Sequence, residues 1–320
     1  MSARTALAFA AAAALLLSAC DNIRPPRTGK QPSSDAAPAG APATAAAPAV
    51  AAAPGEFSPP SEADIPEGPF GDMVRRGRDI FLDTPTHAGE FVGNDLSCGN
   101  CHLDAGRKAD SAPLWGAWVR YPAFRGKNQR VNNFTERLQG CFTYSMDGTA
   151  PPAGHDVVVA LEAYSFWMSQ GAPVGATLPG AGYPKGERPD TPPDFARGEA
   201  VYAANCAICH GADGQGQQGD GRTVFPPLWG PKSFNWGAGM HQLDNAAAFI
   251  RANMPLGKGG TLSVQDAWDV ALYMNGHERP QDPRFTGDVA ETRTRFHDDP
   301  DSPYGTTVDG RLLGANPATR

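Results

Sequence analysis

The chain has 320 residues and a formal net charge of −7 at pH 7. Its length allows two small domains with additional segments. Its acidity argues against nucleic acid as a partner, because phosphate backbones are bound by basic patches. No basic segment indicates attraction to a membrane surface either.

The first residues predict export. Arg4 precedes an apolar run from Ala6 to Leu17, which is too short for a spanning helix and is typical of a signal peptide. Cys20 directly follows Leu-Ser-Ala, as in bacterial lipoprotein signals; the alternative is an ordinary signal peptide that ends near a cysteine. We expect a signal peptide over residues 1–19, lipid attachment at Cys20, and a place on the periplasmic side of a bacterial membrane, held by the lipid anchor only.

Residues 20–68 are rich in Ala and Pro and hold almost no large apolar side chains. Such a segment cannot bury enough apolar surface to offset the entropy of ordering it. We expect it to tether the folded body to the membrane.

Two Cys-x-x-Cys-His motifs dominate the body of the chain. In such a motif two thiols bond the vinyl groups of a haem, and the adjacent histidine ligates the iron. One copy alone could be a redox or zinc pair, but two copies in an exported chain predict two covalently bound haem c groups. The attachment residues are Cys98, Cys101, Cys206 and Cys209, and the iron-ligating histidines are His102 and His210.

The two halves of the chain repeat one another around these motifs. Gly77 and Phe81 precede the first motif, and Gly198 and Tyr202 precede the second, each pair spaced to share one helical face. Glycine on that face allows close approach to another helix, and matching last helices are predicted at 156–169 and 263–275. Aromatic residues on these last helices are expected in the core.

This repeat predicts an all-α fold of two fused class I cytochrome c domains with long loops. The second loop, at 211–221, contains five glycines and no strand pattern. We place the first domain at 69–175, the linker at 176–192, the second domain at 193–283, and an irregular C-terminal tail at 284–320.

A second shared motif, Pro-Leu-Trp-Gly, brings the sixth iron ligands into register. Cys141 follows Leu114 by 27 residues, and Met254 follows Leu228 by 26. We predict Cys141 on the first iron and Met254 on the second; Met240 stays an alternative for the second iron, and an inert buried thiol stays an alternative for Cys141. A thiolate lowers the reduction potential and a thioether raises it, so the two haems would form a directional relay.

Basic side chains gather near Cys141 in the sequence. A cationic pocket would suit a small dianion, which guanidinium groups grip by paired hydrogen bonds. The alternative for each of these side chains is that it binds a haem propionate or stays exposed to solvent. The residues are Arg107, Lys108, Arg125, Lys127, Arg130 and Arg137.

Several segments resemble the dihaem thiosulfate dehydrogenases: Asn100 to Arg107, Tyr121 to Arg125, Glu136 to Phe142, Met240 in its Gly-Ala-Gly context, and Arg251 to Pro255. The resemblance implies oxidation of two thiosulfates to tetrathionate, or the reverse. The first haem, with His and Cys ligands, would be the active site. The second, with His and Met ligands, would pass electrons to a soluble or membrane-bound acceptor such as a cytochrome c.

For the individual residues, the resemblance implies that Cys141 is the catalytic iron ligand. Arg125 and Arg130 become candidates for binding the substrate, and Arg137 is a further catalytic candidate. Asn253, with Arg251, would approach the pocket between the domains.

The chain also departs from the family's pattern. Tyr144 and Asp147 stand where the family commonly has Arg and Asn, and Asn253 stands where some members have Lys. The main alternative function is a tethered dihaem electron carrier without its own substrate. A dihaem peroxidase would need an open coordination site, which the register of Cys141 argues against.

Overall fold

A computed structural model describes residues 57–184 and 186–319. The predicted signal peptide, Cys20 and most of the predicted tether lie outside the described residues. Within the described ranges, none of the helices has the length and apolar character that a membrane crossing requires.

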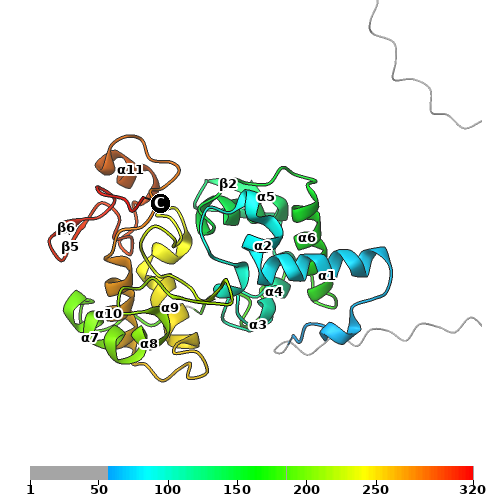
Figure 1. The fold of residues 1–320 in the computed structure, drawn as a ribbon, viewed down its shortest axis with the longest axis horizontal. Helices are drawn as coiled ribbons and strands as arrows, with labels where there is room; N and C mark the ends of the chain where they lie inside the picture. Colours follow the sequence, from blue (N-terminus) through cyan, green and yellow to red (C-terminus); the bar gives the residue numbers. More distant parts are fainter. Residues whose placement is uncertain (1–56, 185, 320) are drawn as a thin grey trace, which may run out of the picture. The chain divides into compact units, whose positions relative to one another are not determined.

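The first domain is built around the crossing of α1 (Pro69–Leu82) and α6 (Asp156–Met168), which lie against each other in Figure 1. Gly77 sits at the crossing, where a Cβ atom would lie 2.0 Å from the carbonyl oxygen of Ala160. Only glycine allows the backbones to approach so closely. The remaining elements are α2 (Thr84–Ala88), η2 (Gly89–Phe91), η3 (Cys98–Asn100), α3 (Leu103–Gly106), α4 (Leu114–Trp118), β1 (Ala123–Arg125), β2 (Arg130–Asn132), α5 (Phe134–Gly140) and the π-helix η4 (Cys141–Ser145).

The second domain repeats this crossing with α7 (Phe195–Asn205) and α10 (Val264–Asn275). A Cβ atom at Gly198 would lie 2.1 Å from the carbonyl oxygen of Asp269. The predicted last helices and their glycine contacts are therefore confirmed in both halves. The other elements are α8 (Ala207–His210), β3 (Gln217–Gly219), β4 (Arg222–Phe225), η5 (Gly239–His241) and α9 (Leu243–Asn253).

The aromatic residues predicted for the core are buried with one exception. Tyr164, Trp167, Trp268 and Tyr273 are buried at the helix crossings. Phe166 is 44 % exposed, because it meets Phe70 of α1, itself 41 % exposed, at the surface.

The prediction of no strand at 211–221 is wrong. β3 and β4 form an antiparallel hairpin, joined by Asp220 and Gly221 with positive φ values of 50° and 75°. Two consecutive residues with positive φ make the turn that matches the twist of paired strands, and Asp-Gly is a strong sequence signal for it. The glycine content of the loop concealed that signal.

The C-terminal tail is also more regular than predicted. It forms α11 (Val289–Phe296) and a second hairpin of β5 (Thr307–Val308) and β6 (Arg311–Leu312). Tyr304 and Leu313 are fully buried and pack with Trp236 of the second domain. The tail is thus a structured part of the second half.

The ordered body begins before residue 69. The ring of Phe57 lies 5.3 Å from that of Trp115, and η1 (Glu62–Asp64) follows. Glu62 pairs with Arg78 on α1 at 2.9 Å. The last part of the segment expected to be a tether is therefore packed on the first domain.

Direct hydrogen bonds join the two domains. The Nδ2 atom of Asn94 donates to the carbonyl oxygen of Ser233 at 3.1 Å. In the other direction, Asn235 donates through Nδ2 to the carbonyl oxygen of Thr143 and to the Oδ1 atom of Asp147, both at 2.9 Å. Asp147 therefore has a role in joining the domains.

Candidate active site and haem cavities

The first domain contains a cavity of about 170 Å³, here named the Cys141 cavity. It brings together the thiols of Cys98 and Cys101, the imidazole of His102 and the thiol of Cys141. Most of its other lining is apolar, including Phe81, Leu114, Phe134, Leu138, Phe142 and Leu161.

The His102 side chain is prepared to ligate a metal. Its Nδ1 atom lies 2.7 Å from the carbonyl oxygen of Ala112, which leaves Nε2 for the iron. Burial lowers the pKa of His102 to about 4, so the ring is neutral near pH 7. A neutral imidazole held by a backbone carbonyl is the usual form of a metal-ligating histidine.

Cys141 begins the π-helix η4 directly after α5, and π-turns of this kind recur at functional sites. The Nη1 atom of Arg137, one helical turn earlier, donates to its sulfur at 2.6 Å. Arg137 also lines the cavity, and the nearby Cys141 is the main cause that raises the pKa of its guanidinium. The cavity thus holds a sulfur ligand candidate beside a buried positive charge.

The structure does not bring the other predicted arginines to the cavity lining. The Arg130 side chain is 59 % exposed and pairs with Glu136 at 2.6 Å. The Nη1 atom of Arg125 donates to the hydroxyl of Tyr121 at 3.2 Å. Both lie on or beside the β1–β2 hairpin, whose course the sequence did not reveal.

Tyr144 lies between two cations. The Nζ atom of Lys127 is 3.6 Å from the centre of the Tyr144 ring, and the guanidinium carbon of Arg284 is 5.2 Å from it. Lys127 also donates to the carbonyl oxygen of Gly237, and burial lowers its pKa to about 7. The position where the family commonly has Arg therefore carries an aromatic ring in contact with two basic side chains.

Asn253 joins the domains and does not line either haem cavity. It is fully buried, and its Nδ2 atom donates to the carbonyl oxygens of Asp110 at 3.0 Å and Phe249 at 3.1 Å. Asp110 lies two residues before Ala112, the partner of His102. Asn253 therefore braces the loop that orients the first histidine ligand.

Residues outside the first domain complete the Cys141 cavity. Tyr183 of the linker and Asn245 of α9 line it, together with Gly239 and Met240. The ring of Tyr183 packs against Phe249 at 5.5 Å. No motif marked Tyr183 or Asn245 in the sequence, because each reaches the cavity only through the docking of the two domains.

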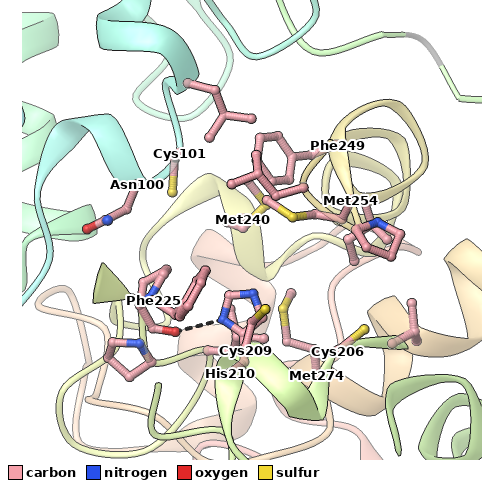
Figure 2. Close-up of a pocket in the computed structure, with 18 of the residues that line it drawn as sticks. Asn100, Cys101, Cys206, Cys209, His210, Phe225, Met240, Phe249, Met254 and Met274 are labelled. Atoms are coloured by element: carbon pink, nitrogen blue, oxygen red, sulfur yellow. Dashed lines mark hydrogen bonds between the residues drawn. The ribbon is translucent and has the colours of Figure 1, made fainter. Parts of the chain in front are cut away.

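The second domain contains a cavity of about 240 Å³, here named the His210 cavity (Figure 2). Cys206, Cys209 and His210 line it, and the Nδ1 atom of His210 lies 2.9 Å from the carbonyl oxygen of Pro226. Burial lowers the pKa of His210. This half repeats the arrangement around His102.

Figure 2 shows Met240 and Met254 across the His210 cavity from His210. Met254 lines only the His210 cavity, whereas Met240 lines both cavities. Met274 is 5 % exposed and also borders the cavity. Both predicted candidates for the sixth ligand are thus within the site.

The two cavities share part of their walls. Leu96, Cys101, Phe234 and Met240 line both of them. A group in one cavity is therefore separated from a group in the other by a single layer of side chains.

Each cavity suits a large, flat and mostly apolar group. Each contains the two thiols of its own Cys-x-x-Cys-His motif and one neutral imidazole with a free Nε2. The rest of the lining is mostly apolar, and the volume far exceeds that of a single water molecule. The fold and the sites together define a dihaem c-type cytochrome.

Comparisons with known proteins agree with this class. Residues 89–174 match the family "SoxA/TsdA, cytochrome c domain", and residues 193–274 match the family "Cytochrome C oxidase, cbb3-type, subunit III". The chain is 60 % identical over 253 residues to a thiosulfate dehydrogenase of Thiomonas intermedia, covering 79 % of this chain and 81 % of that protein. It is 57 % identical over 255 residues to one of Stutzerimonas stutzeri, covering 79 % of this chain and 83 % of that protein.

A solved structure is similar throughout the body. It is the thiosulfate dehydrogenase TsdBA of Marichromatium purpuratum in its "as isolated" form, with a TM-score of 0.80 and 53 % identity. The match covers 83 % of this chain, which spans 59 % of the length of that protein. The chain belongs to the thiosulfate dehydrogenase family; it is an oxidoreductase with two cytochrome c domains and two covalently bound haem c groups.

Proposed function

We propose that this chain oxidises two thiosulfates to tetrathionate in the Cys141 cavity. The observation that carries the proposal is the convergence of His102, Cys141 and the Arg137 guanidinium on one cavity with a haem attachment motif. The choice of thiosulfate as the substrate rests on the similar proteins, which are thiosulfate dehydrogenases.

The cavity suits the charge of the substrate. Thiosulfate is a small dianion, and bringing two of them together is opposed by their mutual repulsion. The Arg137 guanidinium lies in the cavity wall, where a low dielectric strengthens its attraction for an anion. Tyr183 and Asn245 add polar groups to the lining.

Cys141 carries the covalent chemistry. Its thiolate forms a bond to the sulfane sulfur of one thiosulfate, giving a cysteine S-thiosulfonate and releasing two electrons. A second thiosulfate then attacks the sulfur next to the cysteine, so that tetrathionate forms and the thiolate returns. No proton moves in either step, so no general acid or base is required.

The haem in each cavity supplies the capacity to accept one electron at a time. His102 and Cys141 would hold the first haem, and His210 and Met254 the second. Because the two cavities share a wall, electrons would pass from the first to the second haem and then to a separate acceptor, such as a cytochrome c. Lipid attachment at Cys20 would keep this exchange at the periplasmic side of a membrane.

The test is Cys141→Gly in the holoprotein, with thiosulfate and tetrathionate each assayed with artificial redox partners. We expect thiosulfate-dependent haem reduction to fall to background while both haems stay attached. Near-infrared spectra of the wild type should show a His/Cys and a His/Met ferric haem. Normal turnover in Cys141→Gly would disprove the catalytic role of Cys141. Two His/Met haems with no turnover in the wild type would indicate an electron carrier.

A further inference from the structure

Arg279 is a buried cation without a carboxylate partner. Its side chain is fully buried, and no ion pair involves it among the residues that the structure describes. Its guanidinium donates to the carbonyl oxygens of Leu228 and Met274, both at 3.2 Å, and to the Oδ1 atom of Asn275 at 2.9 Å. These acceptors are neutral, so they stabilise the guanidinium by hydrogen bonds but do not neutralise its positive charge.

Arg279 lies directly behind the wall of the His210 cavity. Leu228 and Met274, whose carbonyl groups it binds, both line that cavity. Its guanidinium carbon is 4.1 Å from the ring centre of Phe234, which lines both cavities. None of the described residues that line the His210 cavity is an Asp, Glu, Lys or Arg.

The charge is retained at neutral pH. Burial lowers the pKa of Arg279 to about 9, which still leaves the guanidinium protonated at pH 7. The neighbouring Glu278 is engaged elsewhere, since its carboxylate accepts from the Nε1 atom of Trp236 at 3.1 Å and from the backbone of Gly314 at 3.0 Å. The rings of Phe234 and Trp236 help the protein to hold the cation away from water.

The two cavities therefore lie in different electrostatic fields. In the Cys141 cavity Arg137 donates to the Cys141 sulfur at 2.6 Å, and the thiolate proposed for Cys141 would offset its charge. At the His210 cavity the buried cation has only neutral partners. A fixed positive charge in a low-dielectric surrounding stabilises an added electron nearby.

We propose that the buried positive charge of Arg279 raises the reduction potential of the haem bound at His210 relative to that of the haem bound at His102. The proposal requires the second haem to be present and does not depend on which substrate the first cavity accepts. Its effect is to favour the reduced form of the second haem.

The test compares Arg279→Met with Arg279→Lys in the holoprotein, by redox titration of each haem's absorbance. Loss of the charge should shift the redox equilibrium of the His210 haem about tenfold toward the oxidised form, which corresponds to about 59 mV for one electron. Arg279→Lys keeps the charge and loses the forked hydrogen bonds, so it should retain most of the wild-type potential. The first haem should shift less in both variants.

Two further variants separate charge from packing. Asn275→Asp places a carboxylate at the atom that accepts from Arg279, without a change of volume, although it removes a donor to the carbonyl oxygen of Met240. It should lower the potential of the second haem and keeps the proposal testable if Arg279→Met does not fold. Arg188→Met is the control, because Arg188 is 63 % exposed and paired with Asp301, and it should leave both potentials unchanged.

The result that overturns the proposal is an unchanged second-haem potential in Arg279→Met or, if that variant does not fold, in Asn275→Asp. Equal falls in potential for Arg279→Met and Arg279→Lys would also overturn it, because they would assign the effect to packing. Either result would leave the proposed oxidation of thiosulfate untouched, since that is measured by turnover.

Discussion

Replacing Arg137 by Met tests whether this guanidinium stabilises the sulfur of Cys141 during turnover. The two groups are 2.6 Å apart in the wall of the Cys141 cavity. A hydrogen bond to a charged partner contributes about 1.5–3 kcal/mol. Since 1.36 kcal/mol corresponds to a tenfold change in rate, the loss should lower kcat/KM for thiosulfate by about 10- to 150-fold.

The matched control is Arg130→Met. Arg130 was an equal candidate in the sequence, but its side chain is 59 % exposed and paired with Glu136. Arg130 is exposed and lies outside the lining of the Cys141 cavity, so kcat/KM for Arg130→Met should stay close to that of the wild type.

The assay is thiosulfate-dependent reduction of an artificial acceptor, with haem content and thermal unfolding measured in parallel. Equal losses in Arg137→Met and Arg130→Met would refute the reasoning, because they would show a general effect of positive charge. Full activity in Arg137→Met, with both haems attached, would refute it as well.

Gly77→Ala should destabilise the chain by about 1–3 kcal/mol in urea unfolding, because its Cβ atom would lie 2.0 Å from a carbonyl oxygen of α6; Gly89→Ala, with nothing within 4 Å, is the control and should have little effect. Burial lowers the pKa of His277 from 6.5 to about 4, so the unfolded chain takes up the proton first and the free energy of unfolding falls as the pH drops through that range. His277→Gln should reduce this slope in pH-dependent denaturation, and an unchanged slope would contradict the assignment. Asn253→Leu should lower the free energy of unfolding by about 1–3 kcal/mol, since the carbonyl of Asp110 loses its donor. A raised KM for thiosulfate with unchanged stability would instead place Asn253 at the substrate.

The features that the sequence predicted well depend on short spacings. The haem motifs fix their own local geometry, and the pairing of Gly77 and Gly198 with the last helices follows from two helical faces. The register of Cys141 and Met254 depends on a repeat within one chain. Both side chains line the expected cavities, and their ligation of iron stays a prediction.

The features that the sequence did not predict depend on contacts between residues far apart in the chain. Arg130 and Arg137 are similar in the sequence, yet the β1–β2 hairpin turns one to solvent and α5 turns the other into the cavity. Tyr183 reaches the Cys141 cavity from a linker whose composition indicated only a loop. Nothing local distinguishes such residues, because their surroundings are made by another domain.

The wall shared by the two cavities bears on how the protein matures. Cys101 lies in that wall, so the docking of the domains restricts access to its thiol. Figure 2 shows Cys101 beside the His210 cavity. Haem can be joined to this thiol only while it is accessible, and we therefore expect attachment of the first haem to precede closure of the interface. Protease should cut the linker of a chain produced without haem and spare that of the mature protein. Assembly of the protein would then be ordered by its cofactor, with attachment of the first haem preceding the docking of the two domains.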